Sequence, residues 1–450
     1  MAIQVAAGEV LVDEAPVGSA ITTMGSAEGS PTRIPVSRYT STDFAALEAE
    51  RLWPRVWQIA CSVDHVAQPG DFFEYRVGAY AVLIVRGDDG ELRAFQNVCR
   101  HRGNVLCSGS GSGLSELRCG YHRWSWDLQG RLREVPSRRG FGLLRNEDFP
   151  LLAASVGTWG PIVFVNLDPD AMPLADYLEG VPDDIAWAGI DDFRCTATVV
   201  VPIEANWKTI SDGFSETYHV QGLHREMLAS MDDINSAQRL WRHHGKSAQP
   251  YGVPSPRFRR PPSDQEVWDS FVQTQGGRMG VTEQGPVPPV PEGATVADVI
   301  AEGIRRHHRA DGVDLSAFDT AQMLCLNQYN LFPNATVLVA PDLMTILCGR
   351  PGPTPDSGQM VGINFRRGAD AGAPRSRPVD VTAPADVADF GMVLNQDVAI
   401  LPRVQRGMHQ PGFTHLALSS EECRLINTHR NLERYLDIRP SEITGGPRPR

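Results

Sequence analysis

Two short stretches of the sequence, CRHRG and CGYH, each offer one cysteine and one histidine. The first supplies Cys99 and His101, and the second supplies Cys119 and His122. Histidine is costly to bury unless its ring nitrogens have partners, so a purely structural role explains these residues poorly. Thiolates and imidazoles are ligands of zinc, copper and iron. The spacing therefore predicts a metal site built from two loops.

Three interpretations fit this site. A Cys2His2 zinc site uses the same ligands, but it usually spaces them as C-x-x-C and H-x(3–5)-H. A disulfide between Cys99 and Cys119 would leave both histidines without a role. A Rieske [2Fe–2S] cluster binds two Cys on one iron and two His on the other, which suits one Cys–His pair from each loop. We favour the Rieske cluster, then zinc, and take Cys107 as a loop residue.

A second group of ligand residues lies in NWKTISDGFSETYHVQGLH. Glu216 and His219 are three residues apart, so on a helix they share a face and can hydrogen-bond. His219 and His224 are five apart, so they reach one metal only if the helix ends or bulges between them, which Gly222 would allow. Two His and one carboxylate form the facial triad of non-heme Fe(II) oxygenases. The alternative, two satisfied polar groups in a buried helix, explains the triplet less well.

The motif C-R-H-R-G, followed by C-x-Y-H-x-W and W-D-L-Q-G-R, closely resembles the Rieske domain of Rieske non-heme iron oxygenases. N-W-K with E-x-x-H-x(4)-H resembles the catalytic motif of the same family. The sequence from about 38 to 435 as a whole is similar to the aromatic-ring-hydroxylating dioxygenase α subunits. The resemblance implies a cluster held by Cys99, His101, Cys119 and His122. It also implies that Trp124 and the Gly-rich loop shield this cluster.

The same resemblance makes His219 and His224 ligands of a mononuclear Fe(II). Glu216 takes the place of the family's Asp that bridges this iron site to the cluster ligand His122 of an adjacent subunit. Gly213 stands where the family commonly has Asn near the iron, which leaves a gap for water or substrate. The third ligand is expected to be Asp397, because NQDVAILPRVQRG resembles a late segment of the family. Asp386 and Asp389 are nearby alternatives.

The sequence around the first site consists mainly of short runs in which apolar and polar residues alternate. DFFEYRV, YAVLIVR, ELRAFQNV, RLREV and PIVFVNLD predict an all-β module around both Cys–His loops. Later runs predict an antiparallel sheet: CTATVVVPIE, MLCLNQYNLFP, ATVLVAPD, MTILCGRP and QMVGINFRR. Helices are expected at 42–57, 206–231, 297–309, 384–406 and 420–437. Residues 245–295 are rich in Pro and Gly and predict surface loops, and a last strand is expected at 415–418.

The predicted fold class is α+β, an all-β Rieske domain followed by a helix-grip domain whose antiparallel sheet has helices on one side. The expected organisation is a flexible tail at 1–37, an N-terminal helix packing on the catalytic domain at 38–57, a Rieske domain at 58–167, a catalytic iron domain at 168–440 and a C-terminal tail at 441–450.

Composition limits the partners. The chain of 450 residues has 42 basic and 54 acidic residues, and its net charge of −12 argues against nucleic acid or an anionic membrane as the main partner. Eight scattered cysteines without a secretory signal favour a reducing, cytoplasmic location. No run of about 18 apolar residues predicts a membrane helix.

The expected substrate pocket is mostly apolar, which favours an aromatic or other hydrophobic substrate. Its predicted lining residues are Met227, Met231, Leu326, Tyr329, Phe332, Val337, Val339, Met344 and Phe390.

The resemblance implies a terminal oxygenase that uses O2 to mono- or cis-dihydroxylate a hydrophobic ring. The resemblance also implies that electrons come from NAD(P)H through a ferredoxin or flavin reductase. The absence of a G-x-G-x-x-G between a strand and a helix agrees with a nicotinamide held on a different protein. The alternative within the family is an O- or N-demethylase or a hydroxylase of quaternary ammonium compounds, although no aromatic cage is evident. Outside the family, the chain would be a non-catalytic electron carrier or a zinc protein. A head-to-tail homotrimer is implied, with or without a small β subunit.

Overall fold

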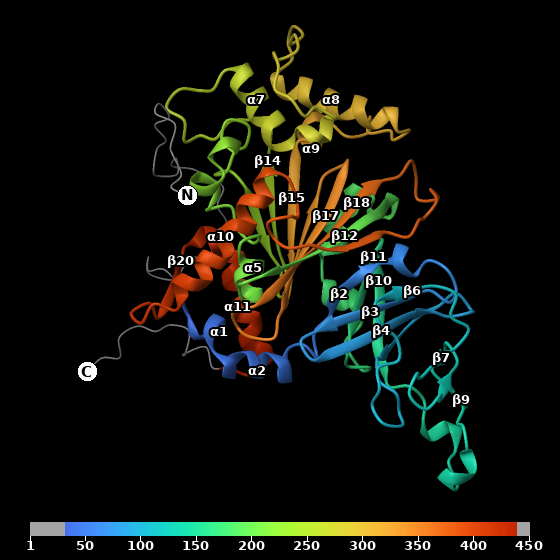
Figure 1. Cartoon of the computed structure of the whole chain (residues 1–450). Helices are drawn as coiled ribbons and strands as arrows, with labels where there is room; N and C mark the ends of the chain where they lie inside the picture. The colour runs from blue at the N-terminus through green and yellow to red at the C-terminus, as the bar shows by residue number, and fades with distance from the viewer. Residues whose placement is uncertain (1–31, 439–450) are drawn as a thin grey trace.

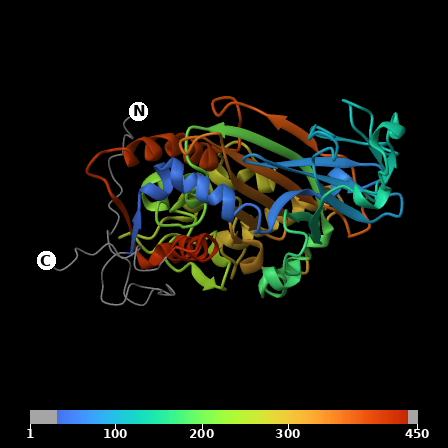
Figure 2. The same cartoon turned by 90° about the horizontal axis from the view of Figure 1, so that it is seen from below.

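Two sheets pack against each other at the centre of the molecule (Figures 1 and 2). The computed structural model describes residues 32–438. A seven-stranded sheet belongs to the N-terminal region and an eight-stranded sheet to the C-terminal region. The helices Trp207–Asp212 and Met392–Met408 pack on the face of the larger sheet that points away from the smaller one. The predicted α+β class is therefore confirmed.

The seven-stranded sheet is antiparallel throughout and has the order β2-β11-β10-β5-β4-β3-β6. Its strands are β2 (Gln58–Ser62), β3 (Phe72–Val77), β4 (Tyr80–Arg86), β5 (Leu92–Gln96), β6 (Ser110–Gly111), β10 (Ala153–Trp159) and β11 (Ile162–Asn166). A small separate sheet is formed by β7 (Leu117–Arg118), β8 (Ser125–Trp126) and β9 (Leu132–Glu134). The five strands predicted here are present, but β2 and β10 were missed because neither alternates cleanly between buried and exposed residues.

The eight-stranded sheet has the order β13-β14-β15-β16-β17-β18-β12-β19, and only β19 runs parallel to its neighbour. Its strands are β12 (Phe193–Ile203), β13 (Ala237–Leu240), β14 (Gly245–Pro250), β15 (Cys325–Leu331), β16 (Ala335–Val339), β17 (Leu343–Pro351), β18 (Gly358–Arg367) and β19 (Val379–Thr382). At the N-terminal end, β1 (Thr32–Pro35) pairs with β20 (His415–Leu418).

The helices are mostly short. They are α1 (Ser37–Thr40), α2 (Thr42–Arg51), α3 (Leu174–Leu178), α4 (Val181–Ile185), α5 (Trp207–Asp212), α6 (Val220–Leu223), α7 (Asp264–Gln275), α8 (Val296–Ala310), α9 (Thr320–Met323), α10 (Met392–Met408) and α11 (Cys423–Leu436). In the part of the chain that the structure describes, none of them combines the length and apolar character needed to cross a bilayer.

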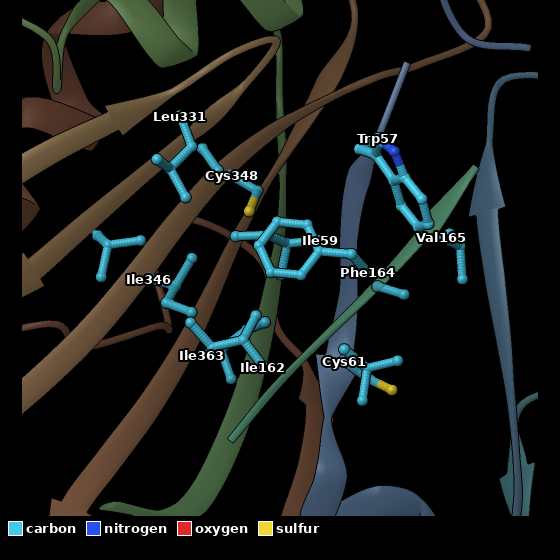
Figure 3. Packing of buried hydrophobic residues seen from close by; sticks show 14 of the residues in the cluster. Trp57, Ile59, Cys61, Ile162, Phe164, Val165, Leu331, Ile346, Cys348 and Ile363 are labelled. Carbon is cyan, nitrogen blue, oxygen red and sulfur yellow. The ribbon is translucent and has the colours of Figure 1, made fainter. Parts of the chain in front are cut away.

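Side-chain alternation on β17 separates the two faces of the large sheet. Leu347 packs with residues of α5 and α10, whereas Ile346 and Cys348 face the seven-stranded sheet. Figure 3 shows Ile346 and Cys348 beside Ile59 and Phe164 from β2 and β11. Burial between two sheets makes this the main hydrophobic core and fixes one region against the other.

The N-W-K motif ties the candidate ligand segment to the N-terminal helix. The Asn206 side chain caps α5 by accepting from the Lys208 N–H at 3.0 Å. Trp207 Nε1 donates to Glu48 of α2 at 3.0 Å, and Lys208 Nζ lies 2.6 Å from the same carboxylate. The α2 helix is itself capped by Ser41 and ends at Arg51, before Pro54.

The Glu48–Lys208 pair should be costly to break on one side. Both side chains are at most 2% exposed, so Lys208→Met would leave an uncompensated carboxylate in the core. We expect the free energy of unfolding, measured by chemical denaturation, to fall by about 3–5 kcal/mol. In the double variant Glu48→Gln/Lys208→Met, the amide oxygen still accepts from Trp207 and most of the loss should be recovered. Equal destabilisation of the single and double variants would contradict this explanation.

Three sequence expectations need correction. The helix expected at 206–231 is broken into α5, α6 and a short 3-10 turn, Arg225–Met227. The loops expected at 245–295 contain β14, an inner strand between β13 and β15, and α7, which begins at a Ser263–Glu266 capping box. The predicted tail at 1–37 includes β1, because Thr32–Pro35 find backbone partners in β20. The rest of both predicted tails lies mainly outside the described residues, and the domain boundaries remain predictions.

Candidate metal centres and the adjoining cavity

The two Cys–His loops have the same backbone geometry. In the first, Cys99 N–H donates to Asn104 O at 2.8 Å and Gly103 N–H donates to Cys99 O at 3.0 Å. In the second, Cys119 N–H donates to Trp124 O at 2.8 Å and Arg123 N–H donates to Cys119 O at 3.0 Å. The fourth residue after each cysteine has a positive φ, 76° at Gly103 and 64° at Arg123. Each loop thus turns back after its histidine.

These paired turns bring the four predicted cluster residues together. The rings of His101 and His122 have centroids 4.6 Å apart, and Trp124 stacks on His101 at 5.1 Å. Cys99 and Cys119 are both buried. The Nδ1 atom of His101 is buried and has no hydrogen-bond partner within residues 32–438. A metal bond would satisfy it.

The Cys119 sulfur accepts N–H groups from two sides. Tyr121 N–H lies 3.4 Å from Sγ, and Asn104 Nδ2 from the other loop lies 3.7 Å away. Donors around sulfur are a means by which proteins stabilise iron–sulfur clusters. Tyr121, which adjoins His122, is 57% exposed, so this side of the site faces outward.

The donor arrangement favours two metals over one. Four ligands of a single tetrahedral zinc ion would lie within about 4 Å of one another. Among the described residues, only His219, His224 and Asp397 form a group of three or more His, Cys, Asp or Glu whose ligand atoms lie within 4.8 Å. The four loop residues are more widely spread, which fits a two-iron cluster with a Cys side and a His side. None of the eight cysteines is in a disulfide.

The break between α5 and α6 creates the second site. The α5 helix ends at Asp212, and an irregular segment carries Glu216 and His219 before α6 begins. The chain leaves α6 at His224, where φ is −118° and ψ is 47°. Between the two histidines, the helix therefore ends at His224 itself rather than at Gly222, which is within α6.

Asp397 from α10 completes the group of three. Its Oδ1 lies 2.9 Å from His224 Nε2 and 3.7 Å from His219 Nε2. The rings of the two histidines have centroids 5.1 Å apart. The alternatives lie elsewhere: Asp386 is exposed, and Asp389 accepts from Gly391 N–H at the start of α10.

Hydrogen bonds to the Nδ1 atoms orient both histidines for metal binding. His219 Nδ1 lies 2.5 Å from Glu216 Oε1, and His224 Nδ1 lies 2.6 Å from Gln396 Oε1. The Gln396 amide nitrogen donates to Glu226, so its oxygen must face His224. With Nδ1 as the donor in each ring, both Nε2 lone pairs point toward Asp397 Oδ1, as in a carboxylate–histidine–metal arrangement. These residues therefore fit the predicted iron. Sequence reasoning missed Gln396, although it directly precedes Asp397.

Glu216 is held as an anion beside its histidine. Its Oε2 also accepts from the backbone N–H of His219 at 3.0 Å. Burial alone would raise the pKa of Glu216, but the charge and hydrogen bonds of His219 hold it below its usual value, with a smaller contribution from Arg424.

The sheet fixes the loop that carries this glutamate. The Phe214 carbonyl accepts from Gln328 Nε2 at 2.5 Å, Asn330 Nδ2 at 3.1 Å and Thr336 Oγ1 at 3.1 Å. Arg424 Nη1 orients both amides by donating to their oxygens at 2.7 Å. The loop is thus tied to β15, β16 and α11.

A cavity of about 440 Å³ adjoins the three candidate ligands. Met227, Met231, Leu326 and Phe390 line it as the sequence predicted. The other predicted pocket residues were wrong, because they lie on the opposite face of the sheet in the core against the seven-stranded sheet: Tyr329, Phe332, Val337, Val339 and Met344. Alternation explains the error, since the cavity receives the neighbouring side chains Gln328 and Leu338 instead.

Gly213 lines this cavity and a second one, of about 450 Å³, on the α10–α11 side. A Cβ at this position would lie 3.2 Å from Leu401 Cδ2, so a larger residue would have to displace that side chain.

A directed hydrogen-bond chain ends at Asp212, which sequence reasoning named only as a neighbour of Gly213. Arg38 Nη1 can only donate, so His429 Nδ1 accepts from it at 3.2 Å and Nε2 carries the proton. His429 Nε2 then donates to Tyr39 Oη at 2.7 Å, and Tyr39 donates to Asp212 Oδ2 at 2.6 Å. Burial nevertheless raises the pKa of Asp212 to about 7, although the Tyr39 hydrogen bond lowers it.

Asp212 should make stability depend on pH. An unfolded Asp titrates near pH 4, so between about pH 4 and 7 the folded state binds more protons and the free energy of unfolding falls as pH rises. Asp212→Asn removes this loss. In chemical denaturation of iron-free protein, we expect the variant to match the native chain near pH 4 and to exceed it by up to roughly 4 kcal/mol at pH 8. The exposed Asp386→Asn should show no such trend, and a pH-independent effect of Asp212→Asn would contradict the assignment.

Comparison with known proteins matches both halves of the chain to family models. The Rieske [2Fe-2S] domain matches residues 56–150, and the ring hydroxylating alpha subunit (catalytic domain) matches residues 190–438. A solved quaternary ammonium Rieske monooxygenase has the same fold, with a TM-score of 0.66 at 19% identity over 90% of this chain and 96% of that chain.

Two curated relatives share part of the sequence. The carnitine monooxygenase oxygenase subunit of Acinetobacter baumannii is 32% identical over 188 residues, which cover 41% of this chain and 51% of that protein. The glycine betaine monooxygenase oxygenase subunit of Chromohalobacter salexigens is 30% identical over 203 residues, 44% of each chain. The chain thus spans about half the length of the curated relatives it matches.

Proposed function

Because the chain belongs to the family of ring hydroxylating alpha subunits, we propose that it is the oxygenase component of a Rieske system and that it oxidises a quaternary ammonium compound. The names of the two relatives support this substrate class over the aromatic ring that the motifs first favoured. The chain contains the Rieske domain and the mononuclear-iron catalytic domain of this family, whose members use O2 with electrons from a reductase.

The observation that carries the proposal is the cavity beside His219, His224 and Asp397. When bound, the cluster supplies single electrons and the mononuclear iron supplies the place where O2 reacts. The three residues would hold that iron, while Glu216 and Gln396 keep the ring protons of the histidines on Nδ1. The apolar side chains Met227, Met231 and Leu326 limit water in the cavity and surround the substrate.

Turnover with isotopically labelled O2 tests the substrate class. We expect the holoenzyme with a surrogate reductase to place one labelled oxygen atom in a product of a quaternary ammonium panel and to leave an aromatic hydrocarbon panel unchanged. Two labelled atoms in an aromatic ring, with no ammonium turnover, would overturn the proposal. The cleavage of a C–N bond or the retention of all carbons in the product would then separate demethylation from hydroxylation.

We also propose that electrons pass between subunits of a homotrimer, from His122 of one chain toward Glu216 of the next. The β7–β9 end of the molecule lies away from α5 and α10 in both views, which argues against transfer within one chain (Figures 1 and 2). Exposed apolar side chains support contacts at both places, with Leu143 99% exposed near the cluster and Tyr218 48% exposed beside His219. A particle of about three times 49.3 kDa in light scattering is expected, and a fully active monomer would contradict it.

A further inference from the structure

The cavity beside the candidate iron ligands carries fixed charge of one sign. Glu216, Asp389 and Asp397 line it, and no Lys or Arg is among the described residues that do so. Its two histidines are the candidate iron ligands: each Nδ1 is bonded to Glu216 or Gln396, and each Nε2 is directed toward Asp397. A substrate carboxylate would therefore enter without a cationic partner from the protein.

The Gln328 side chain at the sheet side of the cavity is already engaged. Gln328 Oε1 accepts from Arg424 Nη1 at 2.7 Å and from Gln249 Nε2 at 2.9 Å. Its Nε2 donates to the Phe214 carbonyl. Arg424 is the nearest guanidinium along this network, but it lies behind Gln328 and does not line the cavity. Burying a carboxylate here would leave its charge unpaired, which is strongly unfavourable.

A positive charge, by contrast, would find a carboxylate partner just before the N-terminus of α10. Asp389 Oδ1 accepts from Gly391 N–H and from Asn395 Nδ2, both at 2.9 Å, and no group among residues 32–438 donates to Oδ2. These hydrogen bonds, led by that of Asn395, hold the pKa of Asp389 below its usual value. The carboxylate is exposed at the rim, so its charge acts on the cavity through a partly screened medium.

Phe390 provides an aromatic face next to this carboxylate. The ring lies over the backbone of β18, where a Cβ added at Gly362 would come within 3.3 Å of Phe390 Cε1. Glycine at this position lets the ring settle against the sheet while it lines the cavity. A carboxylate and a ring on consecutive residues are suited to an alkylated ammonium group, which lacks N–H donors and is held by charge and by cation–π attraction.

We propose that the substrate is an ammonium cation whose remaining groups are uncharged, and that Asp389 and Phe390 bind its head. This rests on the proposed function and narrows it, because carnitine and glycine betaine both carry a carboxylate. The head lies at the exposed rim, and the uncharged end extends toward Asp397 and His224, which are buried. This orientation also keeps the cation away from the positive charge of the iron.

Calorimetric binding to the anaerobic holoenzyme tests the charge requirement with three probes of similar size. Choline carries a cationic head and an uncharged hydroxymethyl group, glycine betaine has a carboxylate in place of the hydroxymethyl group, and 3,3-dimethyl-1-butanol is the neutral counterpart of choline. We expect choline to bind at least about 10-fold more tightly than either of the other two. Glycine betaine binding as tightly as choline would overturn the inference while leaving the proposed function intact. Binding of none of the ammonium probes, together with turnover of an aromatic compound, would overturn both.

Variants test the two residues. Asp389→Asn keeps an oxygen that accepts from Gly391 and Asn395, so the start of α10 should persist while the charge is lost. We expect choline affinity to fall about 10-fold and binding of the neutral alcohol to stay unchanged, with Phe390→Leu giving a similar selective loss. Asp386→Asn, an exposed carboxylate that does not line the cavity, is the matched control. Equal effects of Asp386→Asn and Asp389→Asn, or equal losses for choline and the alcohol, would overturn the assignment.

Discussion

Replacing His219 by Ala is expected to remove the mononuclear iron and to lower product formation by more than about 100-fold, beyond what loss of an orienting partner alone costs. Only His224 and Asp397 would remain of the three candidate ligands, and their side chains cannot close the site alone. The cluster loops share no element with this site, so the absorption and electron paramagnetic resonance spectra of the cluster should persist.

Metal analysis provides the second readout of this variant. We expect the iron content to fall from about three to about two atoms per chain while acid-labile sulfide stays constant. His409→Ala is the control, since this exposed histidine contacts Asp356 and lies outside both candidate sites. Unchanged iron content and product formation in His219→Ala would show that these residues do not bind the reactive metal.

Glu216→Gln is expected to slow electron delivery without removing either metal. The amide oxygen of Gln can still accept from His219 Nδ1, but the negative charge 2.5 Å from that nitrogen is lost. Mutating a hydrogen-bond partner of a metal ligand typically lowers metal affinity or activity by about 10- to 100-fold. In a single-turnover experiment with the cluster reduced beforehand, the rate of cluster oxidation on adding substrate and O2 should fall within this range.

The control for this variant keeps the charge. Glu216→Asp shortens the side chain by one methylene and restores the acid that resembling proteins carry, so it should retain more of the rate than Glu216→Gln. Iron content and substrate affinity should remain unchanged in both variants. Cluster oxidation at the native rate in Glu216→Gln would remove the proposed bridging role.

The ligand residues could be predicted from the sequence because their types and spacing reflect coordination chemistry. Paired Cys–His loops and the E-x-x-H-x(4)-H triplet indicated two metal sites, and the structure brings His219, His224 and Asp397 within 4.8 Å. The supporting residues were harder to predict. Gln396 and Arg424 act through contacts between α10, α11 and the sheet, and such contacts leave no local pattern in the sequence.

Errors in the predicted pocket have a single physical origin. In a strand that is buried on both faces, such as β15 or β16, residue type does not reveal which side chains point toward the cavity and which point toward the other sheet. Tyr329 and Val337 looked suitable by type, but they point toward the seven-stranded sheet. The β14 strand and α7 were missed because Pro and Gly nearby suggested loops, although alternation on β14 and the Ser263 cap were visible in the sequence.

The central claim is that one chain holds two separate iron sites, and an anomalous difference map at the iron edge tests it most directly. Crystals of the holoenzyme should show an elongated peak between the Cys99–His101 and Cys119–His122 loops and a single peak among His219, His224 and Asp397. A zinc-edge peak between the loops, or no iron among the three residues of the second site, would contradict the account.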